Sequence, residues 1–297
     1  MLAAAAHLTH LRALTRLLRL PLAVMVALTA ITGVLAARLP VAGLTVWAVG
    51  TGVLLLTAAS SVLNQLQERA SDALLRRTAT RPLASGALTP GAGRSIGLCL
   101  AGGGLAVLTL GAGPGPALLG LAALTWYLVV YTPLKRISPI AVLAGTPCGA
   151  IPPLLGWLAA GGTLPAPQPL ALALVLFLWQ VPHYWLLALP ERDELQAASF
   201  RVLPHFSDRQ LLAVSLRWFL GLNLATLLLP LLDLPTAPLL QGLVAGLALG
   251  LAVAASWICQ RAVFAAVAAR HLRLLLHLHL ALLLLGLSLD RVLTGPF

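Results

Sequence analysis

The chain has 297 residues, of which 60% are hydrophobic and only 9% are charged, and its mean hydropathy is +0.96. This composition excludes a soluble globular domain and is that of an integral membrane protein. The formal net charge of +11 would suit a nucleic-acid-binding protein, but the basic residues lie at the ends of apolar segments, so we expect no nucleic-acid partner.

Apolar segments recur along the whole chain at lengths of about 18 to 25 residues, enough for a helix to cross roughly 30 Å of hydrocarbon. They are 19–37, 43–66, 94–112, 115–132, 139–159, 168–190, 210–232, 236–258 and 273–290. We therefore predict an all-α membrane protein, a bundle of about nine transmembrane helices. No hydrophilic stretch is long enough for a separate domain, so residues 1–297 form one domain, with residues 1–18 as a cytoplasmic N-terminal segment.

The basic residues gather on alternate connections between these segments. The connections between these charged ones contain no Lys or Arg, except for Arg38 in the first of them. By the positive-inside rule, the N-terminus and the charged loops face the cytoplasm and contact the lipid bilayer there. The first twenty residues lack a signal-peptide layout. This favours the bacterial inner (plasma) membrane, with the mitochondrial inner membrane as the alternative because no acidic residue precedes Glu68.

Acidic residues are concentrated in two of the charged loops. Asn64, Glu68 and Asp72 are spaced at i, i+4 and i+8, so a helix presents them on one face. Side-chain oxygens in such a sparse set suit Mg²⁺, which is usually shared between one or two carboxylates and a phosphate. Spacing alone is equally compatible with ordinary flanking charges in i, i+4 pairs. The acids favour the metal, because carboxylates are not needed for membrane orientation.

Cationic side chains follow these acids and predict a phosphorylated substrate. Arg77 and Arg81 lie in the same loop, and Lys135 and Arg136 follow the fourth segment. Guanidinium groups bind phosphate oxygens in bidentate fashion. A second loop repeats the order of acids, an arginine and a nearby Leu and Pro. A weak internal duplication would place two half-sites across one cavity.

Four stretches carry a family resemblance. They are NQLQERASDALLRRTATRPLASG (64–86), YTPLKRISP (131–139), GAIPPLLGW (149–157) and WQVPHYWLLAL (179–189), the last leading into RDELQAASFRVLP. In order and spacing they resemble the UbiA-type intramembrane prenyltransferases, and among these the heme O synthase branch. The resemblance implies helices around a central cavity and Mg²⁺-dependent binding of farnesyl diphosphate. It further implies transfer of the farnesyl group to a vinyl group of heme B (protoheme IX) with addition of water, giving heme O.

The resemblance also implies roles for individual residues. Those implied for the metal and diphosphate are Asn64, Glu68 and Asp72, with Asp193 and Glu194 as the second acidic half-site. Those implied for substrate binding are Arg77, Arg81, Tyr131, Lys135, Arg136 and His183. The chain departs from the family pattern at Gln65, where many relatives outside the branch have Asp, and at Ala70, where the branch often has Asp. The predicted metal site therefore has fewer carboxylates than the corresponding site of its relatives.

Several interpretations stay open at this point. His183 contacts heme, or it hydrogen-bonds the backbone freed by Pro182. Tyr131 lines the cavity or anchors the membrane interface. The stretch at 149–157 predicts a kinked helix that approaches a neighbour closely. The alternatives to heme O synthesis are a UbiA-type enzyme with an aromatic or quinone-precursor acceptor, and a non-catalytic heme-handling protein; a link to heme A synthesis and oxidase assembly is a further expectation.

Overall fold

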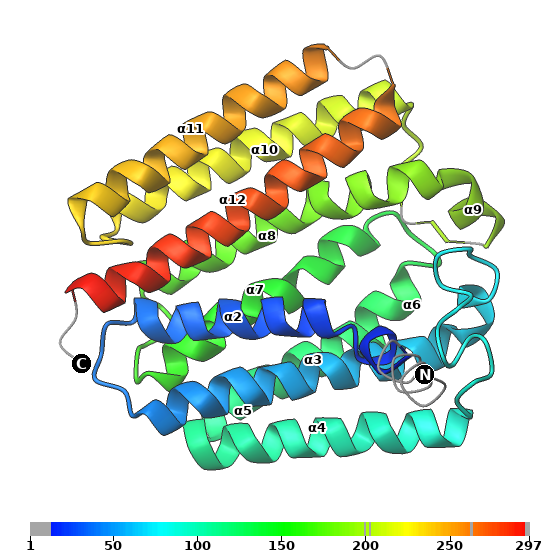
Figure 1. The fold of residues 1–297 in the computed structure, drawn as a ribbon, viewed down its shortest axis with the longest axis horizontal. Coiled ribbons are helices and arrows are strands. Elements are labelled where there is room, and N and C mark those ends of the chain that lie inside the picture. The colour runs from blue at the N-terminus through cyan, green and yellow to red at the C-terminus, as the bar shows by residue number, and fades with distance from the viewer. Residues whose placement is uncertain (1–12, 199, 202, 262–263, 295–297) are drawn as a thin grey trace, which may run out of the picture.

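The computed structural model describes residues 13–198, 200–201, 203–261 and 264–294, and every regular element in these ranges is a helix (Figure 1). The long helices are α2 (Leu20–Ala36), α3 (Gly43–Asp72), α4 (Pro90–Ala112), α5 (Pro114–Thr125), α7 (Ala141–Ala159), α8 (Pro167–Ala188), α10 (Asp208–Leu231), α11 (Pro238–Gln260) and α12 (Ala265–Thr294). Shorter elements are the π-helix η1 (Trp126–Tyr131), α6 (Thr132–Leu134), the 3-10 helix η2 (Leu189–Glu191) and α9 (Arg192–Ala197).

The prediction of a helical membrane protein is confirmed. Among the described residues, eight helical stretches are long and apolar enough to span a membrane, with η1 and α6 extending α5, and η2 and α9 extending α8. Helix α2 has 17 residues and is shorter than these eight. The number of nine spans and the side on which the N-terminus lies stay predictions.

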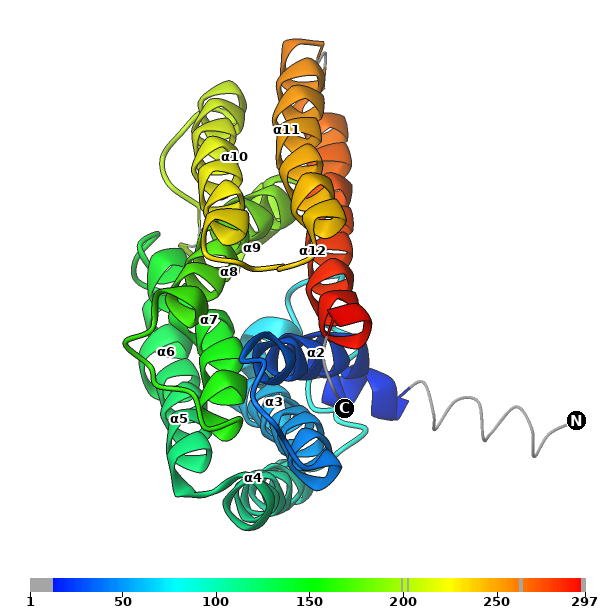
Figure 2. The ribbon, with the colours of Figure 1, turned by 90° about the vertical axis from the view of Figure 1, so that its left-hand side faces the viewer.

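The long helices pack in two groups that meet at α2, α7, α8 and α12. In the first group α2, α3, α4, α5 and α7 enclose one apolar cluster, and in the second α8, α10, α11 and α12 enclose another. The last helix, α12, returns beside α2 and α8, so helices from the first and the last part of the described chain are neighbours (Figure 2). Both α9 and the connection between α3 and α4 lie at the same end of the bundle, and the end of α12 lies at the other (Figure 1).

Helices α2 and α7 are in backbone contact. A Cβ atom added at Gly156 would lie 1.9 Å from the carbonyl oxygen of Ala30, and one at Gly33 would lie 2.1 Å from that of Pro153. Only glycine at both positions permits this distance, the usual device for close helix packing in membranes. The close approach predicted from residues 149–157 is therefore confirmed.

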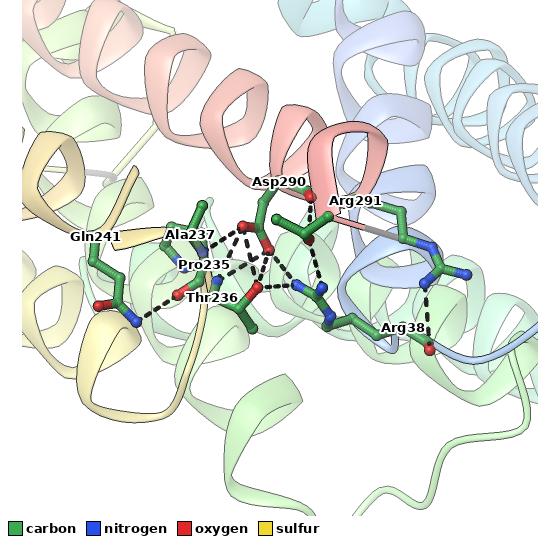
Figure 3. A network of polar contacts seen from close by, with 8 residues as sticks. Arg38, Pro235, Thr236, Ala237, Gln241, Asp290 and Arg291 are labelled. Carbon is green, nitrogen blue, oxygen red and sulfur yellow. Dashed lines mark hydrogen bonds and ion pairs between the residues drawn. The ribbon is translucent and has the colours of Figure 1, made fainter. Parts of the chain in front are cut away.

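A buried carboxylate joins three segments at the far end of the bundle (Figure 3). Asp290 of α12 accepts hydrogen bonds from the backbone N–H groups of Thr236 (3.0 Å) and Ala237 (2.9 Å), and it forms an ion pair with Arg38. Arg38 lies in the α2–α3 connection, whereas Thr236 and Ala237 precede α11. The single basic residue of this connection is therefore the counter-charge of Asp290, a buried carboxylate that needs a partner.

Candidate active site

The last turns of α3 carry the predicted metal ligands. Helix α3 runs 30 residues without a break, so Asn64, Glu68 and Asp72 lie on one face, as their spacing predicts. All three side chains are buried, with 0%, 3% and 2% of their surface exposed. Carboxylates buried this deeply require a counter-charge.

Lys135 and Arg81 supply that charge. Lys135 Nζ lies 2.6 Å from Glu68 Oε2, and Arg81 Nη1 lies 2.7 Å from Asp72 Oδ2. The Asn64 amide donates to Glu68 Oε2 at 3.1 Å and to the Thr132 hydroxyl at 3.2 Å. The π-helix η1 and the short α6 bring Thr132 and Lys135 to this position.

Two oxygen atoms of this group have no hydrogen-bond partner. Asn64 Oδ1 and Glu68 Oε1 are buried and unpaired, a condition that ordinarily costs about 1–3 kcal/mol per group. Hard oxygen atoms on adjacent helical turns are the ligands that Mg²⁺ prefers, so these side chains fit such an ion. Among the described residues no three His, Cys, Asp or Glu side chains gather to hold a metal, so substrate oxygens would have to complete its coordination.

Burial lowers the pKa of both cations. Removal from water lowers the pKa of Lys135, and the nearby Glu68 carboxylate opposes this change. Burial likewise lowers the pKa of Arg81, again opposed by its carboxylate partner, Asp72. Both cations have lost hydration, so an incoming anion would interact with them more strongly than in water.

A cavity of about 690 Å³ contains these groups, and an apolar cavity of about 140 Å³ adjoins it. Glu68, Asp72 and Lys135 line the larger one, together with residues of the second acidic loop and of the segment before α2. The smaller one lies between α2, α3, α5, α7 and α8, and Tyr127 and Tyr184 line both. The charged cavity and the apolar cavity therefore meet at these two tyrosines.

The other residues predicted for the substrate divide into two groups. Arg77, Arg81 and Tyr131 line the larger cavity together with Lys135, as expected. Tyr131 is 7% exposed and its ring lies under Lys135 Nζ at 5.3 Å. Arg136 is exposed and lies outside the cavity lining, with its guanidinium carbon 6.0 Å from the Phe200 ring.

The second acidic loop lies against the first, which agrees with the expected proximity of two half-sites. Glu191 lines the cavity and pairs with Arg77 at 2.9 Å. Glu194 pairs with Arg76, and Asp193 is exposed. A small apolar cluster joins the loops, made of Leu75, Leu195, Ala198 and Phe200. Ligation by Asp193 and Glu194 stays a prediction. Glu191 is a cavity residue that no sequence signal separates from its acidic neighbours.

His183 lies in α8 within an aromatic group outside the lining of the two cavities. Its ring stacks on Trp179 at 4.6 Å and meets the His277 ring edge-on at 5.0 Å. Trp179 Nε1 donates to the Leu276 carbonyl at 2.7 Å, which ties α8 to α12. His183 Nδ1 is buried without a partner, and contact with heme stays a prediction.

Comparison with known proteins agrees with this geometry. Residues 23–281 match the UbiA prenyltransferase family. A protoheme IX farnesyltransferase of Geobacter sulfurreducens is 42% identical over 62% of this chain and 68% of its own length. One of Oleidesulfovibrio alaskensis is 41% identical over 74% of this chain and 78% of its own length.

Solved structures show the same fold. A UbiA homolog from Aeropyrum pernix K1 superposes with a TM-score of 0.73 at 18% identity, covering 92% of this chain and 98% of that one. A UbiA homolog from Archaeoglobus fulgidus bound to GPP and Mg²⁺ gives 0.69 at 16% identity, covering 93% and 99%. The chain belongs to the UbiA prenyltransferase family.

Proposed function

We propose that this chain transfers the farnesyl group of farnesyl diphosphate to a vinyl group of protoheme IX, with addition of water, giving heme O and diphosphate. Relatives at about 40% identity are named protoheme IX farnesyltransferase. The observation that carries the chemistry is the buried group of Glu68, Asp72, Lys135 and Arg81 beside an apolar cavity. A diphosphate and a prenyl chain require these two environments next to each other.

Asn64, Glu68 and Asp72 would hold Mg²⁺, with Asp193 and Glu194 as the second acidic half-site. The bound ion would neutralise charge on the leaving diphosphate. Lys135 and Arg81 are already held by their carboxylate partners at 2.6 and 2.7 Å. They would thus need little reorganisation to stabilise negative charge as the carbon–oxygen bond breaks. Arg77 would add a further positive charge at the wall of the same cavity.

The apolar cavity is the proposed site of the farnesyl chain. Its lining on α7 extends from Gly145 to Leu155, a rise of about 15 Å along a helix and comparable in length with an extended chain of three isoprene units. At about 140 Å³ the cavity would have to widen to hold all of that chain. Leu56 and Leu124 are further lining residues. Such a space excludes water from an allylic cation. The Tyr127 and Tyr131 rings lie 5.3 Å apart at its charged end.

The vinyl group of the acceptor would be the nucleophile, so no side chain need form a covalent bond. A carbon–carbon bond forms to the first farnesyl carbon as its bond to diphosphate breaks. The positive charge that results on the adjacent vinyl carbon is then quenched by water, which loses a proton. By the distribution of arginine and lysine, the reaction faces the cytoplasm from the bacterial inner membrane, and the product could serve heme A synthesis for a terminal oxidase.

The test is expression in cells that make no heme O, followed by extraction of membrane hemes and mass analysis. Wild type should produce the hydroxyethylfarnesyl heme. Asp72→Asn should produce none, because it removes the charge paired with Arg81. Asp233→Asn is the matched control, an exposed aspartate in the α10–α11 connection, and should leave the product unchanged. Wild type that is inserted in the membrane but yields only unmodified heme would refute the proposal; prenylation of an aromatic acid instead would favour another acceptor.

A further inference from the structure

The segment before α2, residues 13–19 and here called the N-terminal arm, places unpaired cations over the active site. Arg16 and Arg19 line the larger cavity, and Arg19 also lines the apolar one. All eight Asp and Glu residues of the chain fall within the described ranges, and none of them pairs with either arginine. The other cations of the cavity lining, Arg77, Arg81 and Lys135, each have a carboxylate partner.

The arm is held in place by Gln65. This side chain is fully buried on α3, and its amide donates to the carbonyl oxygen of Leu17 at 2.7 Å and to that of Arg16 at 3.4 Å. Leu17 is 5% exposed and packs against Val62. A carboxylate at position 65 would have no hydrogen to donate and would face two carbonyl oxygens instead. The residue that stands where many relatives outside the branch have Asp thus has a different role in this structure.

The backbone at the end of the arm is also unusual. Arg19 has φ 47° and ψ 49°, in the left-handed region that side chains other than glycine seldom adopt. Pro21 follows within the first turn of α2. Uncommon backbone conformations of this kind persist where the surroundings enforce them, and they are concentrated at ligand sites.

The lining of the larger cavity has more positively than negatively charged side chains. Its lining contains five cationic side chains and three carboxylates, an excess of two positive charges. Arg19 lines the same cavity as Arg81, and its charge contributes to the lowered pKa of Arg81, after burial as the larger cause. The three paired cations suit the donor, whereas Arg16 and Arg19 remain for a second anionic ligand.

We propose that Arg19, assisted by Arg16, binds the propionate carboxylates of the acceptor, and that Gln65 positions the arm for this contact. The inference rests on the proposed function, because it takes protoheme IX as the acceptor. In protoheme IX the two propionates lie on the edge opposite to one vinyl group. Anchoring them at Arg19 would place that vinyl group on the far side of the porphyrin from the arm, within the larger cavity that also contains Glu68, Asp72 and Lys135.

The experiment compares binding of protoheme IX and its dimethyl ester, which lacks both carboxylates, to the purified full-length protein by the shift of the Soret absorption. Wild type should bind the free acid more tightly than the ester. Arg19→Gln should weaken binding of the free acid about 10-fold to 100-fold, the range for loss of a charge-assisted hydrogen bond. It should leave ester binding unchanged. Arg94→Gln is the matched control, because Arg94 is exposed on α4 outside both cavities.

Gln65→Glu tests the positioning role. It should reduce the preference for the free acid over the ester as Arg19→Gln does, and a change confined to thermal stability would contradict that role. Equal weakening of both ligands by Arg19→Gln would overturn the inference. So would a raised KM for farnesyl diphosphate with intact preference for the free acid, which would assign Arg19 to the donor. Wild type that binds neither ligand would refute the acceptor itself, whereas binding with the expected preference but without heme O would refute only the catalytic proposal.

Discussion

The buried pair of Glu68 and Lys135 provides a prediction in which stability and catalysis separate. Lys135 Nζ lies 2.6 Å from Glu68 Oε2, and the two side chains are 11% and 3% exposed. Lys135→Met leaves a carboxylate in the interior without a counter-charge. The expected loss in free energy of unfolding is about 3–5 kcal/mol, the range for breaking a buried ion pair by removing one partner. Glu68→Gln should cost a similar amount, because it leaves the ammonium unpaired.

The double variant Glu68→Gln/Lys135→Met should recover most of that stability. Replacing both charges removes the desolvation cost together with the attraction, and such replacements are often neutral. The assay is unfolding of the purified protein in detergent, followed by tryptophan fluorescence, with heme O formation measured in parallel. All three variants should be inactive, because both side chains belong to the proposed diphosphate and metal site.

The matched control is the more exposed pair of Arg192 and Asp208, whose side chains are 23% and 54% exposed. Its double-mutant cycle should give a coupling of only about 0–1 kcal/mol. Additive losses in the Glu68 and Lys135 double variant would refute the inference that burial makes these charges interdependent. Wild-type turnover in that variant would refute their place in the catalytic machinery.

Two further predictions concern packing and donor length. Gly156→Ala should destabilise the protein strongly or prevent its insertion, because the added Cβ would lie 1.9 Å from the Ala30 carbonyl oxygen. Gly246→Ala on α11 is the control and should be tolerated, because its Cβ meets nothing within 4 Å. Equal thermal stability of the two variants would contradict the backbone contact. Leu155→Ala should enlarge the apolar cavity and raise kcat/KM for geranylgeranyl diphosphate relative to farnesyl diphosphate. Leu251→Ala is the control, because Leu251 is also buried but lies outside that cavity. Like Leu155→Ala, it should lower the free energy of unfolding by roughly 2–5 kcal/mol, but it should not change the ratio of the two kcat/KM values.

Local features of the site were predictable from the sequence, because they depend on helical spacing. Asn64, Glu68 and Asp72 share a face of α3 through the 3.6-residue period alone. Their partners were only partly predictable: Lys135 reaches Glu68 because η1 and α6 set its position, and single residues carry no signal for a π-helix. The spacing left open whether the acids pair along the helix, and the structure pairs Asp72 with Arg81 in the following loop.

The sequence does not reveal site residues whose position already has another ordinary explanation. Arg19 precedes the first apolar segment, where basic residues ordinarily record membrane orientation, so its place at the junction of two cavities has no separate sequence signal. The sequence shows Gln65 only as a missing carboxylate, because its hydrogen bonds to the arm join residues 48 and 49 positions away in the chain. Glu191 opens the second acidic loop, and only tertiary packing distinguishes it from Asp193.

The pairing of Glu194 with Arg76 gives a test of the second acidic half-site. Arg76 is 93% exposed and Glu194 is 30% exposed, so their pair contributes at most about 1 kcal/mol. A metal ion bound with diphosphate could therefore take Glu194 from Arg76 at little cost. If Glu194 is a ligand, Arg76→Gln should lower the Mg²⁺ concentration for half-maximal activity by up to about 5-fold, because competition for the carboxylate is removed. Glu194→Gln should raise it. An unchanged Mg²⁺ requirement in both variants would show that Glu194 only joins the two loops, and the metal would then depend on Asn64, Glu68 and Asp72.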